Sequence, residues 1–319
     1  MPFGMPQTVS YMKKTTYPKP KLSLDWKATK YTALPGLIWF MFFLIIPLLI
    51  VLGFSFLKRG DFGTVLYELD FSNYKRVLEP LYLKIVLRSL WLAVYTTGIC
   101  LLLAYPLAYH MARTDIKTKQ ILLALIIIPF WINFIIRIYA LKLVLGESGI
   151  INHLLLELNI LQEPLQLTDN ALGVGIGMIY NYFPFMVLPL FVSLEKLDYT
   201  LLDAAYDLGA NKRQVITKIL LPLSLPGMFT GCMFVFIPSF GEFVIPDLLG
   251  GSQTMFVGNL ITETFLKTRD WPFGSALSAL LVLMSMAAFM FVLHRVSAAT
   301  ENVQDINATK HPEREHTYV

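Results

Sequence analysis

The chain has 319 residues, of which 55% are hydrophobic and only 15% are charged, and its mean hydropathy is +0.59. Soluble domains carry roughly a quarter charged residues, so the composition excludes an ordinary soluble protein and predicts an all-α polytopic membrane protein. The formal net charge of +4 is small, and we expect no nucleic-acid partner.

The N-terminal segment differs in composition from the rest of the chain. Residues 1–30 contain six lysines and one acidic residue, and they contain no apolar core of the kind that signal peptides have. We therefore interpret residues 1–30 as a cytoplasmic basic tail.

Six uncharged or nearly uncharged runs follow, each long enough to cross a bilayer, which takes about 17–25 residues. They predict six transmembrane helices in one domain, residues 31–296, followed by a cytoplasmic tail over 297–319. The runs cover residues 31–57, 89–112, 120–136, 170–194, 219–241 and 271–293. The third run resumes after Arg137 and continues to Leu141.

The orientation follows from the lysine and arginine bias between alternate loops. If the N-terminus is cytoplasmic, the inner segments hold 16 basic residues and the outer loops hold 7. We therefore expect both termini in the cytoplasm. The polar segment before the fifth run then also lies on the cytoplasmic side.

That polar segment predicts a helix, a glycine turn and a second helix. Thr200 with an acid three residues later resembles a capping box, and Gly209 is placed to end the first helix in a left-handed conformation. Asn211 is a capping residue for the second helix, which Pro222 and Pro226 are expected to close before the fifth span.

The first of these two helices carries an apolar stripe and a patch of small residues. Its apolar residues recur at helical spacing, and they are Leu201, Leu202, Ala205 and Leu208. Ala204 and Ala205 stand beside Asp203, so another protein surface can approach closely and place an arginine against the carboxylate. The alternative is an ordinary amphipathic helix at the membrane interface.

The spacing D-A-A-x-x-x-G, nine residues, I-L-L-P resembles the EAA loop of ABC-importer permeases, and we call residues 195–222 the EAA loop. The matching positions are Ala204, Ala205, Gly209, Ile219, Leu221 and Pro222, with Asp203 in place of the usual glutamate. The resemblance implies a type I permease fold in a bacterial cytoplasmic membrane. It also implies a coupling helix that seats in a groove of a cytoplasmic ATPase.

The same resemblance implies the partners. These are a dimer of ABC ATPases, a second six-helix permease subunit (a paralogue), an extracytoplasmic binding protein and membrane lipid. The chain has no GxxxxGK[ST] motif. We therefore expect a non-catalytic subunit that binds no cofactor, with ATP used by the partner.

A narrower resemblance concerns the substrate. Residues 237–251 and 129–141 are similar to the corresponding segments of spermidine/putrescine permeases. Residues 132–134, Ile-Asn-Phe, depart from that family, which has a small polar pair after the tryptophan. The resemblance implies polyamine transport and leaves open which polyamine is carried. An ABC permease for an amino-acid derivative or an iron chelate is the alternative.

Two ionisable residues interrupt the apolar runs and are candidates for the pathway or its gate. Glu242 lies 20 residues beyond Pro222, about 30 Å along a helix, and Arg137 lies 17 residues beyond Gln120, about 25 Å along its own helix. At this similar depth they either form an ion pair that closes the outer gate, or Glu242 contacts substrate, or the two roles alternate.

Further residues are assigned to the same pathway. Asp247 follows at the outer rim, and four aromatic side chains offer cation–π faces to an amine, with ordinary packing as their alternative role. The aromatic residues are Trp131, Tyr139, Tyr180 and Tyr182.

The remaining signals favour packing or solvation. Cys100 and Cys232 lie 132 positions apart and indicate neither a disulfide framework nor a zinc site. The glycines of the GVGIG sequence at 173–177 indicate close helix packing. The acidic outer loop at 146–169 is either solvated or in contact with the binding protein.

Two other classes of protein are disfavoured by the sequence. An ion-driven secondary transporter would show inverted repeats or paired broken helices, which the sequence lacks, and a membrane enzyme would show a clustered catalytic set, which it also lacks.

Overall fold

The computed structural model describes residues 34–251 and 254–310, so the predicted basic tail over residues 1–30 lies outside the described part. This part is almost entirely helical, which confirms the all-α prediction. Within it, the strands are β1 (Leu57–Arg59) and β2 (Val65–Leu69), which pair as one antiparallel hairpin around the 3₁₀ turn η2 (Asp61–Gly63).

Within the described residues, five helices are long and apolar enough to cross a membrane, and a bent pair brings the number to six if it is counted as one span. The five are Leu34–Ser55, Pro80–Arg113, Ala171–Glu195, Lys212–Phe240 and Trp271–His294. All five coincide with predicted runs, because an uncharged helix of this length satisfies its own backbone groups inside lipid.

The first of these helices contains the boundary between two compact units, residues 1–49 and residues 50–319. The described part of the first unit is helical, with the π-helical segment η1 (Met41–Ile45) leading into α2 (Ile46–Ser55). Within it, the rings of Trp39 and Phe43 lie 4.2 Å apart.

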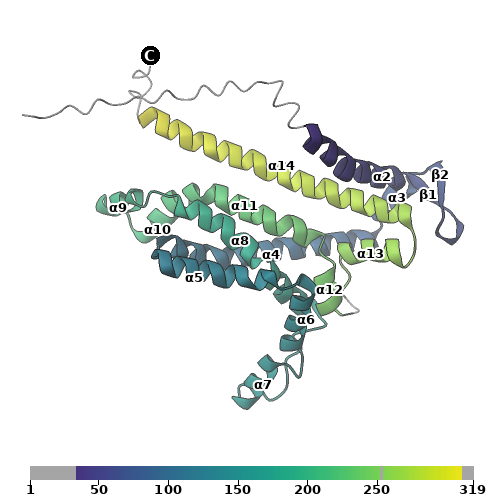
Figure 1. Cartoon of the computed structure of the whole chain (residues 1–319), viewed down its shortest axis with the longest axis horizontal. Coiled ribbons are helices and arrows are strands. Elements are labelled where there is room, and N and C mark those ends of the chain that lie inside the picture. The colour runs from purple at the N-terminus through teal and green to yellow at the C-terminus, as the bar shows by residue number, and fades with distance from the viewer. Residues whose placement is uncertain (1–33, 252–253, 311–319) are drawn as a thin grey trace, which may run out of the picture. The chain divides into compact units, whose positions relative to one another are not determined.

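The second unit is built on three helices that pack along one another, α4 (Pro80–Arg113), α8 (Ala171–Glu195) and α11 (Leu221–Phe240) (Figure 1). Their shared core has fully buried aliphatic, methionine and small side chains. These include Cys100, Ala104, Ala108, Met111, Met178, Met186, Leu190, Leu194 and Val235.

Glycines allow the helices to approach closely, as the GVGIG sequence predicted. A Cβ on Gly177 would lie 2.8 Å from Ile245 Cγ2 of α12 (Val244–Leu249). A Cβ on Gly231 of α11 would lie 2.8 Å from the Met186 sulfur of α8. The packing interpretation of this glycine stretch is confirmed.

The third span is not a continuous helix, contrary to the prediction. It consists of α5 (Ile116–Ile127), the 3₁₀ turn η3 (Ile128–Trp131) and α6 (Phe134–Leu145), and the chain bends by 101°. Pro129 has no N–H with which to continue α5. Asn133 then starts a new helix by accepting a hydrogen bond from the Ile135 N–H at 2.9 Å.

Shorter helices complete the second unit: α3 (Ser72–Val77), α7 (Ile150–Glu157) and α13 (Val257–Leu266). In Figure 1, α6 and α7 extend away from the three-helix core, and α13 packs on α14 (Trp271–Lys310). Because α14 continues to Lys310, the helix extends beyond the predicted end of the last span and into the predicted tail.

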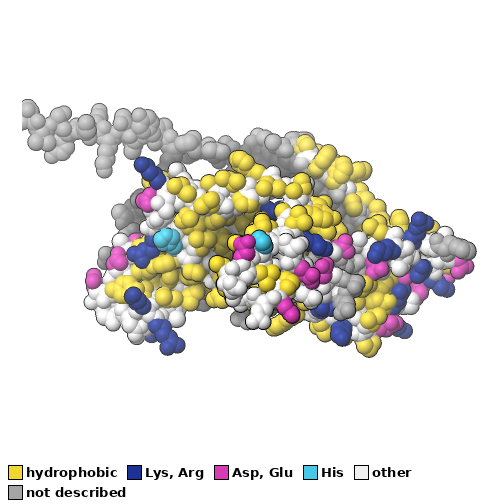
Figure 2. Space-filling view, turned by 90° about the horizontal axis from the view of Figure 1, so that it is seen from below, with side chains coloured by type: hydrophobic (Ala, Val, Ile, Leu, Met, Phe, Trp, Pro, Cys, Tyr) yellow, Lys and Arg dark blue, Asp and Glu magenta, His cyan; other side chains and the backbone are white. Residues whose placement is uncertain are grey.

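Charged side chains gather at particular places on the surface of the second unit. Figure 2 shows Lys, Arg, Asp and Glu around α9 (Thr200–Asp207) and α10 (Lys212–Val215) of the EAA loop and around the β1–β2 hairpin. Hydrophobic side chains cover much of the face between them, with further charges over the projecting α6–α7 segment. This apolar band between charged regions is typical of a membrane-spanning protein.

Candidate functional site

The EAA loop begins with the helix α9 (Thr200–Asp207). The predicted capping box is wrong, because Thr200 is the first helical residue and does not precede the helix. Asp198 provides the cap: its Oδ1 accepts from the Thr200 N–H at 3.1 Å and from the Thr200 hydroxyl at 2.8 Å. Asp203 is therefore free of a capping role within the helix.

The glycine turn is as predicted. Gly209 has φ of +84°, and the Ala210 N–H reaches back to the Ala205 carbonyl at 3.0 Å, which closes the helix end. Asn211 then caps α10 (Lys212–Val215) in a reciprocal capping box with Gln214, and both of its hydrogen bonds measure 2.9 Å.

The second helix is not closed by prolines, contrary to the prediction. From α10 the chain passes through the π-helical segment η4 (Ile216–Leu220) directly into α11, so residues 212–240 form one helix. Pro222 lies in the first turn of α11, where a proline costs little, and Pro226 is tolerated inside the span. The EAA loop is thus joined rigidly to the fifth span.

Buried side chains hold the EAA loop to the bundle. Leu202, Val215 and Leu220 are each no more than 3% exposed and belong to the main core. At the start of the loop, Lys119 Nζ of α5 lies 2.7 Å from Glu195 Oε1. These contacts fix α9 against the ends of neighbouring helices.

The outward side of α9 presents the predicted docking residues and two exposed leucines. Asp203 and Ala204 are exposed, whereas Ala205 is partly buried against the core. The predicted apolar stripe is only partly buried: Leu202 faces the core, but Leu201 is 50% exposed and Leu208 is 89% exposed. Leu201 and Leu208 therefore remain at the surface with Asp203 and Ala204.

The other residues of the EAA motif lie at the turn after α9 and where the loop enters the fifth span. Ile219 packs partly buried against the core, and Leu221 and Pro222 are half-buried at the start of α11. Gly209 is exposed at the turn. The residues that match the EAA motif thus fall into two groups. Those on α9 and at its turn are mostly exposed, and those where the loop enters the fifth span are partly buried.

Arg137 is buried at the bend of the third span. Its Nη2 donates to Asn181 Oδ1 of α8 at 2.6 Å, and its guanidinium lies 4.4 Å from the centre of the Phe130 ring. Nη1 lies 3.4 Å from the carbonyl of Pro129 across the bend. Arg137 therefore connects both sides of the bend to α8.

Glu242 has other partners, so the expected ion pair with Arg137 is not formed in this structure. Its Oε2 accepts from the Tyr182 hydroxyl at 2.7 Å. Its Oε1 accepts from the N–H groups of Phe243 and Val244 at 3.0 and 2.9 Å, just after α11 ends at Phe240. The depth estimate ignored both the bend at Pro129 and the rotation of each side chain about its helix.

The remaining predicted pathway residues differ in exposure. Tyr182 is buried and its ring lies 6.3 Å from that of Phe185. Trp131 is 84% exposed, and Tyr139 and Tyr180 are about half exposed. Asp247 is exposed on α12. The structure thus brings Tyr182 and Glu242 together, and it places the other aromatic residues and Asp247 on the surface.

Sequence reasoning missed Asn181, the residue that receives Arg137. It is an amide buried within a span, and any polar residue at such a position is a candidate for a specific contact. Asn181 and Tyr182 are consecutive on α8, so one helix carries the partners of both Arg137 and Glu242.

Sequence reasoning also missed Asp270, which is 1% exposed just before α14. Its Oδ2 lies 2.7 Å from Arg76 Nη1 and 3.4 Å from Arg59 Nη1. Burial opposes the charge on Arg76, but the hydrogen bond to Asp270 raises the pKa of Arg76 overall. The sequence D-W-P at 270–272 was a usable signal, because an acid before a proline is a common helix start.

Comparison with known families gives a match to the binding-protein-dependent transport system inner membrane component over residues 101–300. The matched segment covers well over half of the chain and contains the whole EAA loop.

Individual relatives are similar over most of their length. The chain is 43% identical to the spermidine/putrescine transport system permease protein PotB of Haemophilus influenzae, over 81% of this chain and 90% of that protein. It is 42% identical to PotB of Escherichia coli, over 81% and 94%. It is 31% identical to the inner membrane ABC transporter permease protein YdcU of Escherichia coli, over 82% and 87%.

Among solved structures, a chain of a bacterial alginate ABC transporter in complex with an alginate-bound periplasmic protein has a similar fold. The TM-score is 0.68 at 17% identity, and the alignment covers 85% of this chain and 94% of that chain. A similarity at this identity concerns the fold alone.

Proposed function

Because the chain belongs to the family of inner membrane components of binding-protein-dependent transport systems, we propose that it is the membrane subunit of an ATP-driven importer for spermidine or putrescine. The identity with the PotB proteins supports the polyamine substrate. A binding protein delivers the polyamine to the outer face, and the energy comes from ATP hydrolysis by a partner.

The observation that carries the proposal is the displayed surface of α9. Asp203, Ala204 and Leu208 are exposed on a helix whose opposite side is fixed by the buried Leu202. We propose that this surface transmits force, because α9 is anchored in the core and is joined through the Gly209 turn to the helix that continues into the fifth span. We assign it as the docking site for one subunit of a dimeric ABC ATPase.

A single EAA loop supplies a single docking site, so the proposed complex needs a second permease subunit, for which a paralogue is the simplest source. The lysine and arginine bias supports cytoplasmic N- and C-termini. In that orientation, α9 faces the ATPase and the segment before α8 faces the binding protein. The chain itself is proposed to hold no cofactor.

Glu242 is proposed to contact the polyamine. Asn181 receives the guanidinium of Arg137, and the partners of the Glu242 carboxylate among the described residues are neutral donors, the Tyr182 hydroxyl and two backbone N–H groups. An arriving ammonium group can therefore form a charge-assisted hydrogen bond with this carboxylate. The exposed Asp247 of α12, which follows Glu242 in the chain, is proposed to extend this surface toward the rim, and the exposed aromatic side chains stay candidates for the same pathway.

The docking proposal is tested with Asp203→Lys in the complete transporter. We expect the variant to lose most co-purifying ATPase and polyamine uptake while the protein level in the membrane is unchanged. Asp61→Lys is the matched control, since it makes the same substitution at an exposed position of the β1–β2 hairpin. Normal uptake and normal co-purification of Asp203→Lys would contradict the docking role.

The substrate contact is tested with Glu242→Gln, which keeps the shape and the acceptor for Tyr182 but removes the charge. We expect uptake and polyamine-stimulated ATP hydrolysis to fall together, while ATPase co-purification is normal. If both activities stay at the wild-type level with normal protein amounts, Glu242 has no role in substrate passage.

A further inference from the structure

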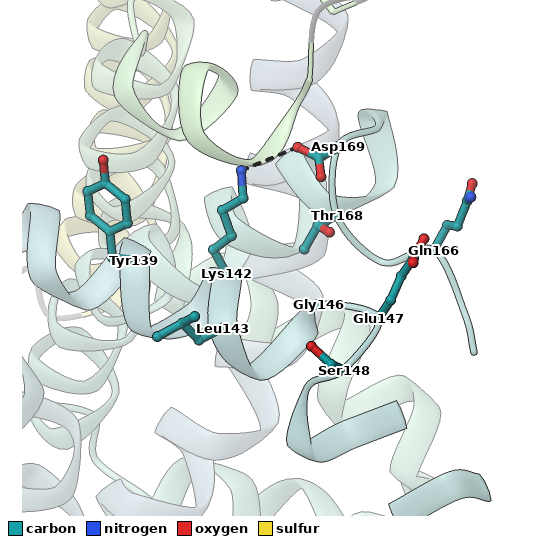
Figure 3. Close-up of a pocket in the computed structure, with 9 residues that line it drawn as sticks. All are labelled: Tyr139, Lys142, Leu143, Gly146, Glu147, Ser148, Gln166, Thr168 and Asp169. Carbon is teal, nitrogen blue, oxygen red and sulfur yellow. Dashed lines mark hydrogen bonds and ion pairs between the residues drawn. The ribbon is translucent and has the colours of Figure 1, made fainter. Parts of the chain in front are cut away.

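A pocket of about 770 Å³ lies between the C-terminal end of α6 and the residues that directly precede α8 (Figure 3). Its lining residues are Tyr139, Lys142, Leu143, Gly146, Glu147, Ser148, Gln166, Thr168 and Asp169. Figure 3 shows the Lys142 side chain reaching toward Asp169, and its Nζ lies 3.3 Å from Asp169 Oδ1.

The pocket lies at the end of α8 opposite the EAA loop. Asp169 directly precedes α8 (Ala171–Glu195), whose 25 residues span about 37 Å before the EAA loop begins. If the EAA loop is cytoplasmic, as proposed above, the pocket faces the side from which substrate arrives.

The lining favours a cation. Two carboxylates, Glu147 and Asp169, stand against the single ammonium group of Lys142. The half-exposed ring of Tyr139 offers a cation–π face at the same pocket.

Lys142 has the chemistry of the proposed substrate. A lysine side chain is an aminobutyl group, which is the unit that makes up putrescine and one arm of spermidine. The structure therefore already contains a primary alkylammonium group bound to Asp169.

We infer that this pocket is an outer subsite for a polyamine: Asp169 binds one terminal ammonium group, for which Lys142 competes, and the Glu147 and Tyr139 side chains that line the same pocket face the rest of the bound molecule. Lys142 holds the carboxylate in the absence of substrate and leaves when a polyamine arrives. This inference rests on the proposed function, because it names a residue set for the same substrate class.

Because the ion pair between Lys142 and Asp169 is exposed, replacing Lys142 by a polyamine costs little free energy. The side chains of Lys142 and Asp169 are 38% and 60% exposed, and an ion pair of this kind contributes little to stability. The backbone at Asp169 is held in place: a Cβ on Gly251 would lie 2.7 Å from the Asp169 carbonyl oxygen, so the two loops pack closely. A weak site that exchanges easily suits a substrate that must move on.

The test compares Lys142→Met with Asp169→Asn in the complete transporter, by measuring spermidine and putrescine uptake over a range of external concentrations. We expect Asp169→Asn to raise the apparent KM by about two- to fivefold, the size expected for one exposed ion pair. We expect Lys142→Met to lower the apparent KM, because the competing ammonium is gone. The double variant should behave like Asp169→Asn.

The matched control is the exposed pair of Lys267 and Glu263, 3.6 Å apart on α13 and its C-terminal end. Lys267→Met and Glu263→Gln should leave the apparent KM unchanged. If the ion pair is only structural, Lys142→Met and Asp169→Asn should change the apparent KM in the same direction. That result would overturn the inference. An unchanged apparent KM in both variants would also overturn it. Absence of polyamine uptake by the wild-type transporter would instead contradict the proposed function.

Discussion

The two charged regions of the unit formed by residues 50–319 use their side chains in opposite ways. At the EAA loop, Asp203 and Leu208 point outward and only apolar side chains such as Leu202 reach into the core. Near the start of α14, Asp270 is almost fully buried and receives Arg59 and Arg76 from segments about 200 positions away. The first region exposes its side chains at the surface proposed to dock the ATPase, and the second ties the hairpin and α3 to the last span.

A high density of charged residues is therefore not sufficient to identify a docking surface. Both regions are rich in charged residues in Figure 2. What distinguishes the EAA loop is that its acid Asp203 and its Leu208 are exposed, whereas Asp270 is buried. Substitutions there should affect assembly and transport, whereas substitutions near Asp270 should affect stability.

The sharpest test of this contrast uses two leucines of the same short segment. Leu202→Ala removes a side chain that is 3% exposed, and we expect it to lower the free energy of unfolding by about 2–4 kcal/mol. Leu208→Ala removes a side chain that is 89% exposed, and we expect no loss of stability but weaker association with the ATPase. Thermal unfolding in detergent and ATPase co-purification measure the two effects. A destabilised Leu208→Ala protein would break the comparison.

The second test is Asp270→Asn, which leaves Arg59 and Arg76 without their shared carboxylate. We expect a loss of about 2–3 kcal/mol, less than for a fully buried pair because both arginines are partly exposed. Thermal unfolding of the purified protein measures it. Glu68→Gln is the control, since its pair with Lys58 is exposed on both sides and should contribute little. Equal effects of the two substitutions would mean that burial of Asp270 is unimportant.

The third test is Gly209→Ala at the turn between α9 and α10. The φ of +84° is unfavourable for any residue with a Cβ, so we expect a cost of about 1–2 kcal/mol. No other atom stands within 4 Å of the added Cβ, so crowding contributes nothing. Asn at this position should recover part of the loss, because it tolerates the left-handed region. Equal melting temperatures for the Ala and Asn variants would argue against the backbone explanation.

The smallest expected effect is a pH dependence at the start of α5. The Thr118 backbone N–H donates to the Asp115 carboxylate and holds the pKa of Asp115 below its ordinary value. Its contribution is therefore present above the unfolded pKa, near 3.9, and is lost as pH falls through the lower folded value. We expect the stability difference between wild type and Asp115→Asn to shrink below about pH 4, in thermal unfolding measured from pH 6 to pH 3. A difference that is constant over this range would contradict the assignment.

The sequence by itself determined the features that depend on local chemistry. The five continuous spans follow from uncharged runs, because only a helix of that length satisfies its backbone in lipid. The glycine turn of the EAA loop follows from Gly209 and Asn211, because the left-handed conformation and the helix cap each depend on a single residue.

The tertiary structure decided which distant side chains meet. Arg137 and Glu242 have similar estimated depths, but the bend between α5 and α6 and the rotation of each helix give them Asn181 and Tyr182 as partners. Asp270 likewise finds Arg76 only through the packing of α3 beside α14. The number of residues along a helix predicts how deep a residue lies. The contacts of that residue also depend on how the helices bend and pack, and the bending and packing are determined by the whole chain.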